Sequence, residues 1–367
     1  MLKVNCRNLA NSISGVQRYT IEIVKRLPLE FEKIQSDFVG IKGHLWEQLM
    51  PVWLPREDLL WSPANTGPIY RKKHVVTIHD AATLDCPAWF ERKFAKWYQY
   101  MLPRLCHNAS GVITVSEYSK SRLVAFTGVE QSKIKVIYNG ISERFIDLKD
   151  NNLQKTEKAF YTTKPFVLFV GSLDPRKNLE RLLLAWERIE NPDFDLVIAG
   201  SGNRVFKQER RRINAKNVVF IGRVSDNELL NLYASAYAFI YPSLYEGFGL
   251  PPLEAMASGC PVATSATSSL PEVCGNAFAD FSRSSRRASI PDCFYSVENN
   301  DVLESTDGAV IYFNPYDINS IAQSIECLLT MAESERNVMI ESAKKISSTF
   351  TWRKAASETS NYLSSFC

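Results

Sequence analysis

The chain has 367 residues, enough for two domains with separate cores, and its 45% apolar and 23% charged content is that of a soluble globular protein. A net charge of +3 excludes the strong basic excess of a dedicated nucleic-acid binder, and no apolar run approaches the ~18 residues of a membrane span. Because the amino terminus lacks the apolar core of a signal peptide, we expect a cytoplasmic protein.

The first half of the chain alternates short apolar runs with longer amphipathic ones, a pattern typical of a parallel sheet covered by helices. Strands are predicted at His74–Asp80, Gly111–Ser116 and Ile134–Gly140, and helices at Gln17–Leu27, Phe90–Leu105 and Glu117–Thr127. A polar stretch without clear periodicity, Asp147–Lys164, is interpreted as a linker.

The second half repeats the same alternation. Strands are predicted at Phe166–Ser172, Asp195–Ser201, Val218–Gly222, Ala238–Ser243 and Pro261–Ser265, with helices near Leu179–Glu190, Asp226–Ser235 and Pro252–Ser258. The predicted fold class is therefore α/β, with two Rossmann-like doubly wound domains facing across a cleft. We expect the domains to span residues 1–157 and 158–351, with a surface insertion at 281–308 and a terminal helix, 352–367, that packs back on the first domain.

One stretch, YEGFGLPPLEAMASG, combines features that neither a simple turn nor a surface helix explains. Glu246 precedes a helix and Glu254 lies just inside it, and Gly247 and Gly249 between them allow a ligand to approach the backbone closely. Free N–H groups at the helix start attract an anion. Taken alone, Glu254 would only interact with its own helix dipole and Glu246 would be solvated. Together, these features favour a sugar nucleotide.

The same stretch resembles the E-x7-E motif of the retaining GT-B glycosyltransferases of family 4, group 1. Beyond it, FVGSLDPRKNL resembles the family's donor-phosphate loop, FIGRVSDNELLNLYASA its nucleobase segment and SSLPEVCGNA the stretch after the motif. In the first half, SGVQRYT, TIHDAATL, VITVSEYSKSRL and VIYNGIS resemble the bacterial mannosyltransferases that build O-antigens. The likeness covers most of the chain except Phe281–Asp307.

The resemblance implies roles for charged residues in the second half. Glu254 would accept hydrogen bonds from the donor ribose, and Glu246 would position the transferred sugar. Arg176 and Lys177 would neutralise the diphosphate as the sugar–phosphate bond breaks. Arginine and lysine are more often solvated surface charges, and Ser172 stands where the family often has a further arginine.

Backbone positions complete the implied donor site. Phe248, Gly249 and Leu250 would contact sugar hydroxyls and phosphate, while Gly171 belongs to the donor-phosphate loop. The segment around Val224 would hold the base. Gly15 is expected in the loop after the first strand, close to the phosphates.

In the first half, His79 at a strand end is a candidate site residue, although a satisfied structural histidine would have the same sequence context. The resemblance implies a histidine near the donor sugar, so we assign His79 to the catalytic set. Asp80, Ser116 and Tyr118 are assigned to the acceptor side.

No metal and no cofactor is expected. The eight cysteines are scattered without a C-x-x-C pair, and Asp193–Asp195, which matches a D-x-D metal motif superficially, is predicted to form a turn before a strand.

The segment Phe90–Leu105 mixes basic and aromatic residues, which suits a lipid headgroup region as well as a core helix with a solvated face. The resemblance to enzymes with lipid-linked acceptors favours peripheral contact with the cytoplasmic face of the inner membrane.

The function implied is transfer of a hexose, most simply mannose from GDP-mannose, with retention onto a lipid-linked oligosaccharide in the synthesis of O-antigen or another surface polysaccharide. The partners would be the nucleotide-sugar donor and the lipid-linked glycan, with no nucleic acid. Two alternatives stay open: a non-catalytic nucleotide-sugar-binding regulatory module, and a sugar-nucleotide epimerase of similar fold.

Overall fold

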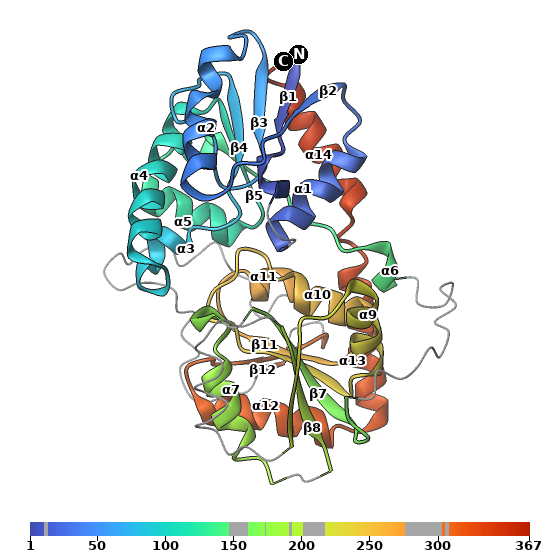
Figure 1. The fold of residues 1–367 in the computed structure, drawn as a ribbon. Helices are drawn as coiled ribbons and strands as arrows, with labels where there is room; N and C mark the ends of the chain where they lie inside the picture. The colour runs from blue at the N-terminus through green and yellow to red at the C-terminus, as the bar shows by residue number, and fades with distance from the viewer. Residues whose placement is uncertain are drawn as a thin grey trace. The chain divides into compact units, whose positions relative to one another are not determined.

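The computed structural model describes residues 1–10, 14–146, 161–172, 174–190, 193–200, 217–275, 303–304 and 308–367. The chain divides into two units, Met1–Gly140 together with Phe350–Cys367, and Ile141–Thr349 (Figure 1). The expected linker Asp147–Lys164 lies outside the described residues as far as position 160, and so does the expected insertion at 281–308 apart from 303–304 and 308.

The first unit is built on a parallel sheet that has six strands within the described residues, in the order β2-β1-β3-β4-β5-β6. The strands are β1 (Leu2–Asn5), β2 (Phe31–Ile34), β3 (Leu59–Ser62), β4 (His74–Thr77), β5 (Gly111–Thr114) and β6 (Ile134–Val136). Every residue of β3, β4 and β5 is buried, as expected for central strands with helices on both faces.

Helices cover this sheet: α1 (Gly15–Arg26), α2 (Gly40–Trp53), α3 (Ala82–Asp85), α4 (Arg92–Asn108), α5 (Glu117–Thr127) and α14 (Trp352–Ser364). The carboxyl-terminal helix α14 packs against α1 (Figure 1). The chain returns beside Gly140, where an added Cβ would lie 2.0 Å from the Trp352 backbone nitrogen. Only glycine permits so close an approach of two backbones.

The second unit contains a sheet in the order β12-β13-β11-β10-β7-β8-β9, parallel except for the β12–β13 pair. Its strands are β7 (Phe166–Val170), β8 (Asp195–Ala199), β9 (Val218–Gly222), β10 (Ala238–Tyr241), β11 (Val262–Ser265), β12 (Leu303–Glu304) and β13 (Ile311–Phe313). Its helices are α6 (Glu143–Ile146), α7 (Leu179–Trp186), α9 (Asp226–Ser235), α10 (Leu250–Ala257), α11 (Leu270–Cys274), α12 (Ile318–Thr330) and α13 (Glu333–Ser347).

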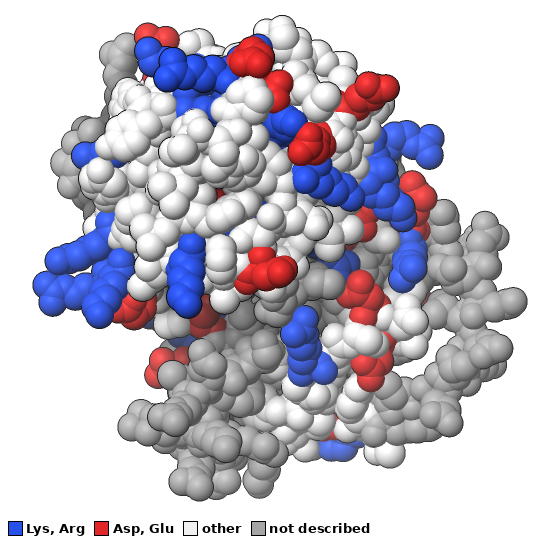
Figure 2. Space-filling view, turned by 45° about the horizontal axis from the view of Figure 1, so that its top comes forward, with Lys and Arg blue, Asp and Glu red and all other residues white. Residues whose placement is uncertain are grey.

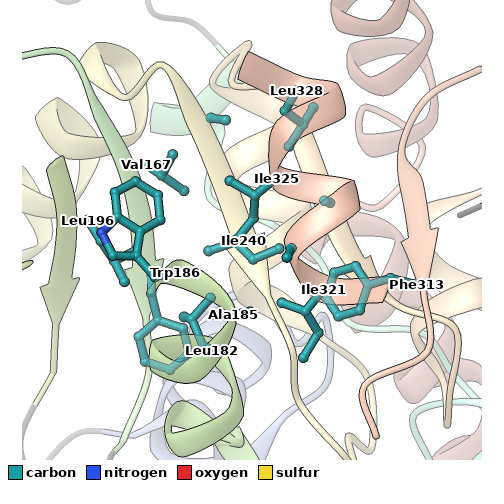
Figure 3. Packing of buried hydrophobic residues seen from close by; sticks show 14 of the residues in the cluster. Val167, Leu182, Ala185, Trp186, Leu196, Ile240, Phe313, Ile321, Ile325 and Leu328 are labelled. Carbon is teal, nitrogen blue, oxygen red and sulfur yellow. The ribbon is translucent and has the colours of Figure 1, made fainter. Parts of the chain in front are cut away.

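The core of the second unit lies between one face of this sheet and helices α7 and α12. Ile321, Ile325 and Leu328 recur at helical spacing on α12 and point toward the sheet, while Leu182 and Trp186 do so from α7 (Figure 3). All five are at most 5% exposed. This packing fixes the strands whose ends carry the predicted site.

The predicted α/β class is confirmed. Every predicted strand and every predicted helix corresponds to an observed element, and their ends differ by a few residues. The strands β1, β2, β3, β12 and β13 were not among the predicted ranges. The strand β2, FEKI, lies at the sheet edge and carries two charges, and β12 has only two residues. Helices α2, α3, α6, α11, α12 and α13 were not predicted either. Helix α2 contains Pro51 and two glycines, which lower helix propensity.

Candidate active site

The second sheet reverses its strand order between β7 and β10. From β7 the chain builds β8 and β9 on one side, and it then returns to build β10, β11 and β13 on the other. Open α/β sheets bind ligands at such a switch point, outside the carboxyl ends of the strands. Arg176 and Lys177 form part of a short 3-10 helix after β7, and Glu246 follows β10. Three predicted site residues therefore come from the two strands that flank the switch point.

Lys177 and Glu246 form an ion pair although 69 positions separate them in the sequence. The Lys177 ammonium also donates to the Tyr241 hydroxyl at 2.7 Å, and that hydroxyl donates to Glu246 Oε1 at 2.8 Å. Ser243 Oγ donates to the same carboxylate oxygen at 2.5 Å. The Lys177 and Glu246 side chains are only 12% and 13% exposed, so little solvent screens the pair.

The Glu246 carboxylate remains charged in this environment. Burial alone would raise its pKa, but the Lys177 ammonium and the hydrogen bonds from Lys177 and Ser243 outweigh burial and hold the pKa of Glu246 below its ordinary value. Burial and the neighbouring carboxylate raise the pKa of Tyr241 well above its usual value. The cluster thus presents a fixed carboxylate, a fixed ammonium and a protonated phenol.

Arg176 lies at the base of the same loop. Its guanidinium contacts the Asp174 carboxylate at 3.2 Å, and Asp174 also accepts from the Arg176 backbone N–H at 3.0 Å as the cap of the short helix. The Arg176 carbonyl accepts from the Leu244 N–H at 2.7 Å, which ties the loop after β7 to the loop after β10. Arg176 is therefore held by its own loop, whereas Lys177 crosses to the Glu246 loop.

The helix α10 begins at Leu250, two residues earlier than predicted, and includes both prolines. Glu254 consequently lies beyond the first turn, which corrects the expected placement just inside the helix start. It is buried at 6% exposure, and the Tyr233 hydroxyl donates to its Oε2 at 3.4 Å. A buried carboxylate in the second turn gains little from its own helix dipole, which falls off within the first turn.

The turn into α10 is fixed by Ser269, whose hydroxyl donates to the carbonyls of Glu246 at 3.0 Å and Phe248 at 2.9 Å. Phe248 itself is buried. Gly171 directly follows β7, and Val224 lies between β9 and α9, half-buried.

Gly249 caps α10 with φ at 107°, a conformation that L side chains rarely adopt, and an added Cβ would lie 2.7 Å from Leu270 Cδ2. We therefore expect Gly249→Ala to lower the free energy of unfolding by more than the ~1–2 kcal/mol of left-handed backbone strain, measured by urea denaturation. Gly222→Ala is the matched control, because Gly222 has φ at 75° but nothing within 4 Å of the added Cβ. Equal losses in the two variants would contradict the close contact with Leu270.

The first sheet also has a switch point, between β1 and β3, because β2 lies on one side of β1 and the later strands on the other. A cavity of about 260 Å³ opens there, within the first unit. Polar side chains from the segments after both strands and from three helices line it, including Arg7, Asn8, Gln17, His44, Asn65 and Tyr98.

Arg7 and Glu47 form a buried ion pair beneath this cavity, with a distance of 3.0 Å between Arg7 Nη2 and Glu47 Oε2. Thr66 Oγ1 and Asn5 Nδ2 each donate to the other carboxylate oxygen at 2.9 Å. Burial would raise the pKa of Glu47, yet the His44 imidazole, whose Nδ1 lies 3.6 Å from the carboxylate, and the charge and hydrogen bond of Arg7 hold it below its ordinary value. The network fixes Arg7 in the wall of the cavity.

The predicted residues of the first unit lie close to the ends of β4 and β5. The His79 Nε2 atom lies 2.9 Å from the Pro63 carbonyl oxygen, which can only accept, so the imidazole carries a proton on Nε2. Burial lowers the pKa of His79, which keeps the ring neutral near pH 7. Asp80 accepts from the Ala82 N–H at 3.0 Å.

Ser116 and Tyr118 are both buried at the start of α5, where Ser116 caps the helix by accepting from the Ser119 N–H at 3.0 Å. The prediction that Gly15 lies in the loop after the first strand was wrong. Gly15 is the first residue of α1, after the cap Ser14, rather than part of the preceding loop.

The sequence analysis did not select four polar residues that belong to these two clusters. Tyr241 and Ser243 stand at the end of a predicted strand, beside residues already selected, so their position could have identified them. Arg7 and Glu47 lie 40 positions apart, and Glu47 belongs to a helix that was not predicted. The stretch Asp193–Asp195 leads into β8, and Asp195 is buried and accepts a hydrogen bond from Thr162.

The basic and aromatic helix predicted at Phe90–Leu105 is α4. Its Met101, Leu102 and Leu105 belong to a core cluster of the first unit, while Phe94 and Tyr100 are exposed at 41% and 42%. One face of α4 therefore packs in the core, and the other face is exposed. In the described part of the chain, no helix has both the length and the apolar character needed to cross a membrane.

Comparison with known proteins finds two family models that match separate parts of the chain. Residues 150–284 match the family described as Glycosyl transferases group 1, and residues 54–145 match Glycosyltransferase Family 4. O-antigen chain mannosyltransferase B of Escherichia coli is 30% identical over 72% of this chain and 82% of its own. O-antigen chain mannosyltransferase RfbU of Salmonella typhimurium is 32% identical over 57% of this chain and 56% of its own.

Among solved structures, HepE of Anabaena in complex with UDP and glucose superposes with a TM-score of 0.70, covering 99% of both chains at 18% identity. This likeness establishes the fold, and the sequence likeness to the Escherichia coli mannosyltransferase establishes the family. The chain belongs to the group 1, family 4 glycosyltransferases and has the two-domain GT-B fold.

Proposed function

We propose that this glycosyltransferase moves a mannosyl group from GDP-mannose onto a lipid-linked oligosaccharide in the synthesis of a bacterial O-antigen or a related surface polysaccharide. The observation that carries the proposal is the Lys177–Glu246 pair at the switch point of the second sheet. The choice of mannose rests on the names of the curated relatives, two of which are O-antigen mannosyltransferases.

The second unit would hold the donor. Lys177 has three N–H donors, of which Tyr241 and Glu246 use two, so the third can donate to a phosphoryl oxygen. Arg176 and the start of α10 add positive potential near the same strand ends. In this proposal Glu246 positions the transferred sugar, Glu254 accepts from the ribose, and Gly171, Val224 and the backbone of residues 248–250 contact the rest of the donor.

The cavity in the first unit would receive the acceptor. At about 260 Å³ it lies just below the usual ~300–1,000 Å³ range of small-molecule sites, which suits one sugar residue at the end of a glycan. Its lining supplies an amide from Asn65, an imidazole from His44 and a phenol from Tyr98, groups that bond hydroxyls. His79, Asp80, Ser116 and Tyr118 stay assigned to the same unit, His79 beside the donor sugar and the others on the acceptor side.

Transfer would proceed with retention and without a divalent metal. The bond between the sugar C1 and the phosphate oxygen breaks, and the acceptor oxygen bonds to C1 on the same face. The acceptor proton passes to the departing phosphate oxygen, so no separate base is required. Lys177 and Arg176 would stabilise the negative charge that grows on the diphosphate.

The test is incubation of the protein with GDP-mannose and a lipid extract, followed by NMR of the product. An α-linked mannoside that forms equally in EDTA supports the proposal. A β-linked product contradicts retention, and loss of product in EDTA that Mg²⁺ or Mn²⁺ restores contradicts metal independence. Product formation without an acceptor would indicate an epimerase instead.

The two glutamates should respond differently to substitution. We expect Glu254→Ala to weaken GDP-mannose binding by about 1–3 kcal/mol, because a ribose hydroxyl loses its acceptor. We expect Glu246→Ala to lower turnover more than binding, because Glu246 faces the reacting sugar. Calorimetry with GDP-mannose and steady-state kinetics measure both. Unchanged affinity and unchanged turnover in both variants would contradict the donor-site assignment.

A further inference from the structure

Three aromatic rings form a continuous row at the start of α4. Phe90 precedes the helix, and Phe94 and Tyr98 follow at intervals of four residues, a spacing that places side chains one above another on a helix. The rings of Phe90 and Phe94 are stacked, with 5.9 Å between their centroids, and the centroids of Phe94 and Tyr98 lie 4.4 Å apart. These three residues are here called the α4 aromatic row.

The α4 aromatic row leads into the cavity of the first unit. Phe94 and Tyr98 line the cavity, and Phe90 lies outside it. Phe94 is 41% exposed although it is apolar, and Phe90 and Tyr98 are half-buried. The row therefore continues from the wall of the cavity to the surface beside it.

The Tyr98 phenol supplies a hydrogen-bonding group next to these rings. Its hydroxyl makes no hydrogen bond with any residue that the structure describes. Burial raises the pKa of Tyr98, so the phenol stays protonated near pH 7 and can donate to a ligand. Asn65 lines the same cavity, and because its side-chain oxygen accepts from the His79 N–H at 2.6 Å, its NH2 group is a further donor.

A chain of sugars has the chemistry that aromatic rings beside hydrogen-bond donors recognise. The C–H groups on one face of a hexose form an apolar, weakly positive patch, which the negative face of an aromatic ring attracts. The hydroxyls around the rim of the hexose bond to side-chain donors and acceptors. The distances between neighbouring rings of the row are close to the length of one sugar unit, so neighbouring rings can hold consecutive sugars.

The charges of α4 do not belong to this surface. The helix has four exposed basic residues, and none of them lines the cavity: Arg92, Lys93, Lys96 and Arg104. Figure 2 shows Lys and Arg side chains gathered on the side of the first unit where Figure 1 draws α4, beside a broad stretch with few charges. Helix α4 therefore contributes two aromatic rings and no charge to the cavity, which suits a neutral glycan better than a lipid phosphate.

We propose that the α4 aromatic row binds the sugars that precede the terminal residue of a glycan acceptor. The terminal sugar occupies the cavity, where Tyr98 donates to one of its oxygens, and the preceding sugars stack on Phe94 and Phe90. This inference rests on the proposed glycan acceptor. It adds that the enzyme recognises a chain of neutral sugars and not the terminal residue alone.

The test is an NMR titration of the whole protein, without donor, with α-linked mannose oligosaccharides of one to four residues. We expect the affinity to rise about threefold to tenfold for each residue added up to three, because each added sugar gains one aromatic contact. Phe90→Ala should lower the affinity for the trisaccharide by about threefold to tenfold and leave that for the single mannoside unchanged, since Phe90 lies outside the cavity. Tyr98→Phe should weaken both ligands by a similar factor, about threefold to tenfold, because it removes one hydrogen bond within the cavity.

Phe126→Ala is the matched control. Phe126 is also 41% exposed and lies in the first unit, on α5, but it does not line the cavity, so this variant should bind every oligosaccharide as the wild type does. Unchanged binding of the single mannoside shows that the Phe90→Ala protein is folded.

Three results would overturn the proposal: no binding of any oligosaccharide, equal affinity for all four lengths, or a trisaccharide affinity that Phe90→Ala does not change. Co-sedimentation with lipid vesicles that Phe90→Ala abolishes, with trisaccharide binding intact, would also overturn it, since the row would then contact lipid. Transfer from GDP-mannose to the same oligosaccharides is measured separately. Binding that rises with length but without transfer supports the row and contradicts the proposed reaction, whereas equally efficient transfer to one and to three residues contradicts the row alone.

Discussion

Replacing Lys177 by alanine is expected to lower kcat for the proposed mannosyl transfer by about 10²–10³-fold, the usual cost of removing one group that stabilises developing charge in a transition state. The ammonium lies between the loops after β7 and β10, held by Tyr241 at 2.7 Å and by the Glu246 carboxylate. Because it is only 12% exposed, little water would replace its charge beside the diphosphate of the proposed donor. Steady-state kinetics with GDP-mannose measure the loss.

Two variants serve as controls for this result. Lys344→Ala removes the same charge from another Lys–Glu pair of the second unit, at 3.4 Å on α13, and should leave kcat unchanged. Lys177→Arg keeps the charge and should recover part of the rate. A Lys177→Ala enzyme with wild-type kcat would remove Lys177 from the transfer step.

The pH dependence separates a role in transfer from a role in folding. In the wild type the Lys177 charge outweighs burial and keeps the pKa of Glu246 low. Lys177→Ala removes the largest influence that lowers the pKa of Glu246, so this pKa rises and the acid limb of the rate profile should move to higher pH. A protein that had merely lost stability would show no such movement.

Most of the central strands, which are largely buried on both faces, were predicted in both units. Strands such as FVLFV and DLVIA read as nearly continuous apolar runs, and all five residues of β8 are buried. The edge strand β2, FEKI, has two exposed charged residues and no such run. Its place is set by pairing with β1, which is a tertiary interaction.

The site residues also divide into those that the sequence identifies and those that only the fold brings together. Lys177 and Glu246 could be selected because each follows a predicted strand within a family motif. That they bond to each other depends on β7 and β10 being neighbours across the switch point, which the sequence order does not reveal. Arg7 and Glu47 belong to no motif, and their pairing follows from the fold of α2 against β1 and β3.

Glu47→Ala is expected to destabilise the first unit by about 3–5 kcal/mol, because it leaves the buried Arg7 charge without its carboxylate. Glu47 is 1% exposed, and Arg7, Asn5 and Thr66 all donate to it. Urea denaturation, followed by circular dichroism, measures the change. Glu22→Ala is the control, since it breaks the partly exposed pair with Arg26 on α1 and should cost no more than about 0.5 kcal/mol.

The same pair makes stability depend on pH. The folded-state pKa of Glu47 lies below its ordinary value, so its contribution is fully present above the pKa of an unfolded glutamate, about 4.3. The contribution falls as the pH drops from there through the folded-state pKa. The difference in unfolding free energy between wild type and Glu47→Ala should therefore shrink at acid pH. A constant difference from pH 7 down to pH 3 would show that Glu47 acts by packing alone and not by its charge.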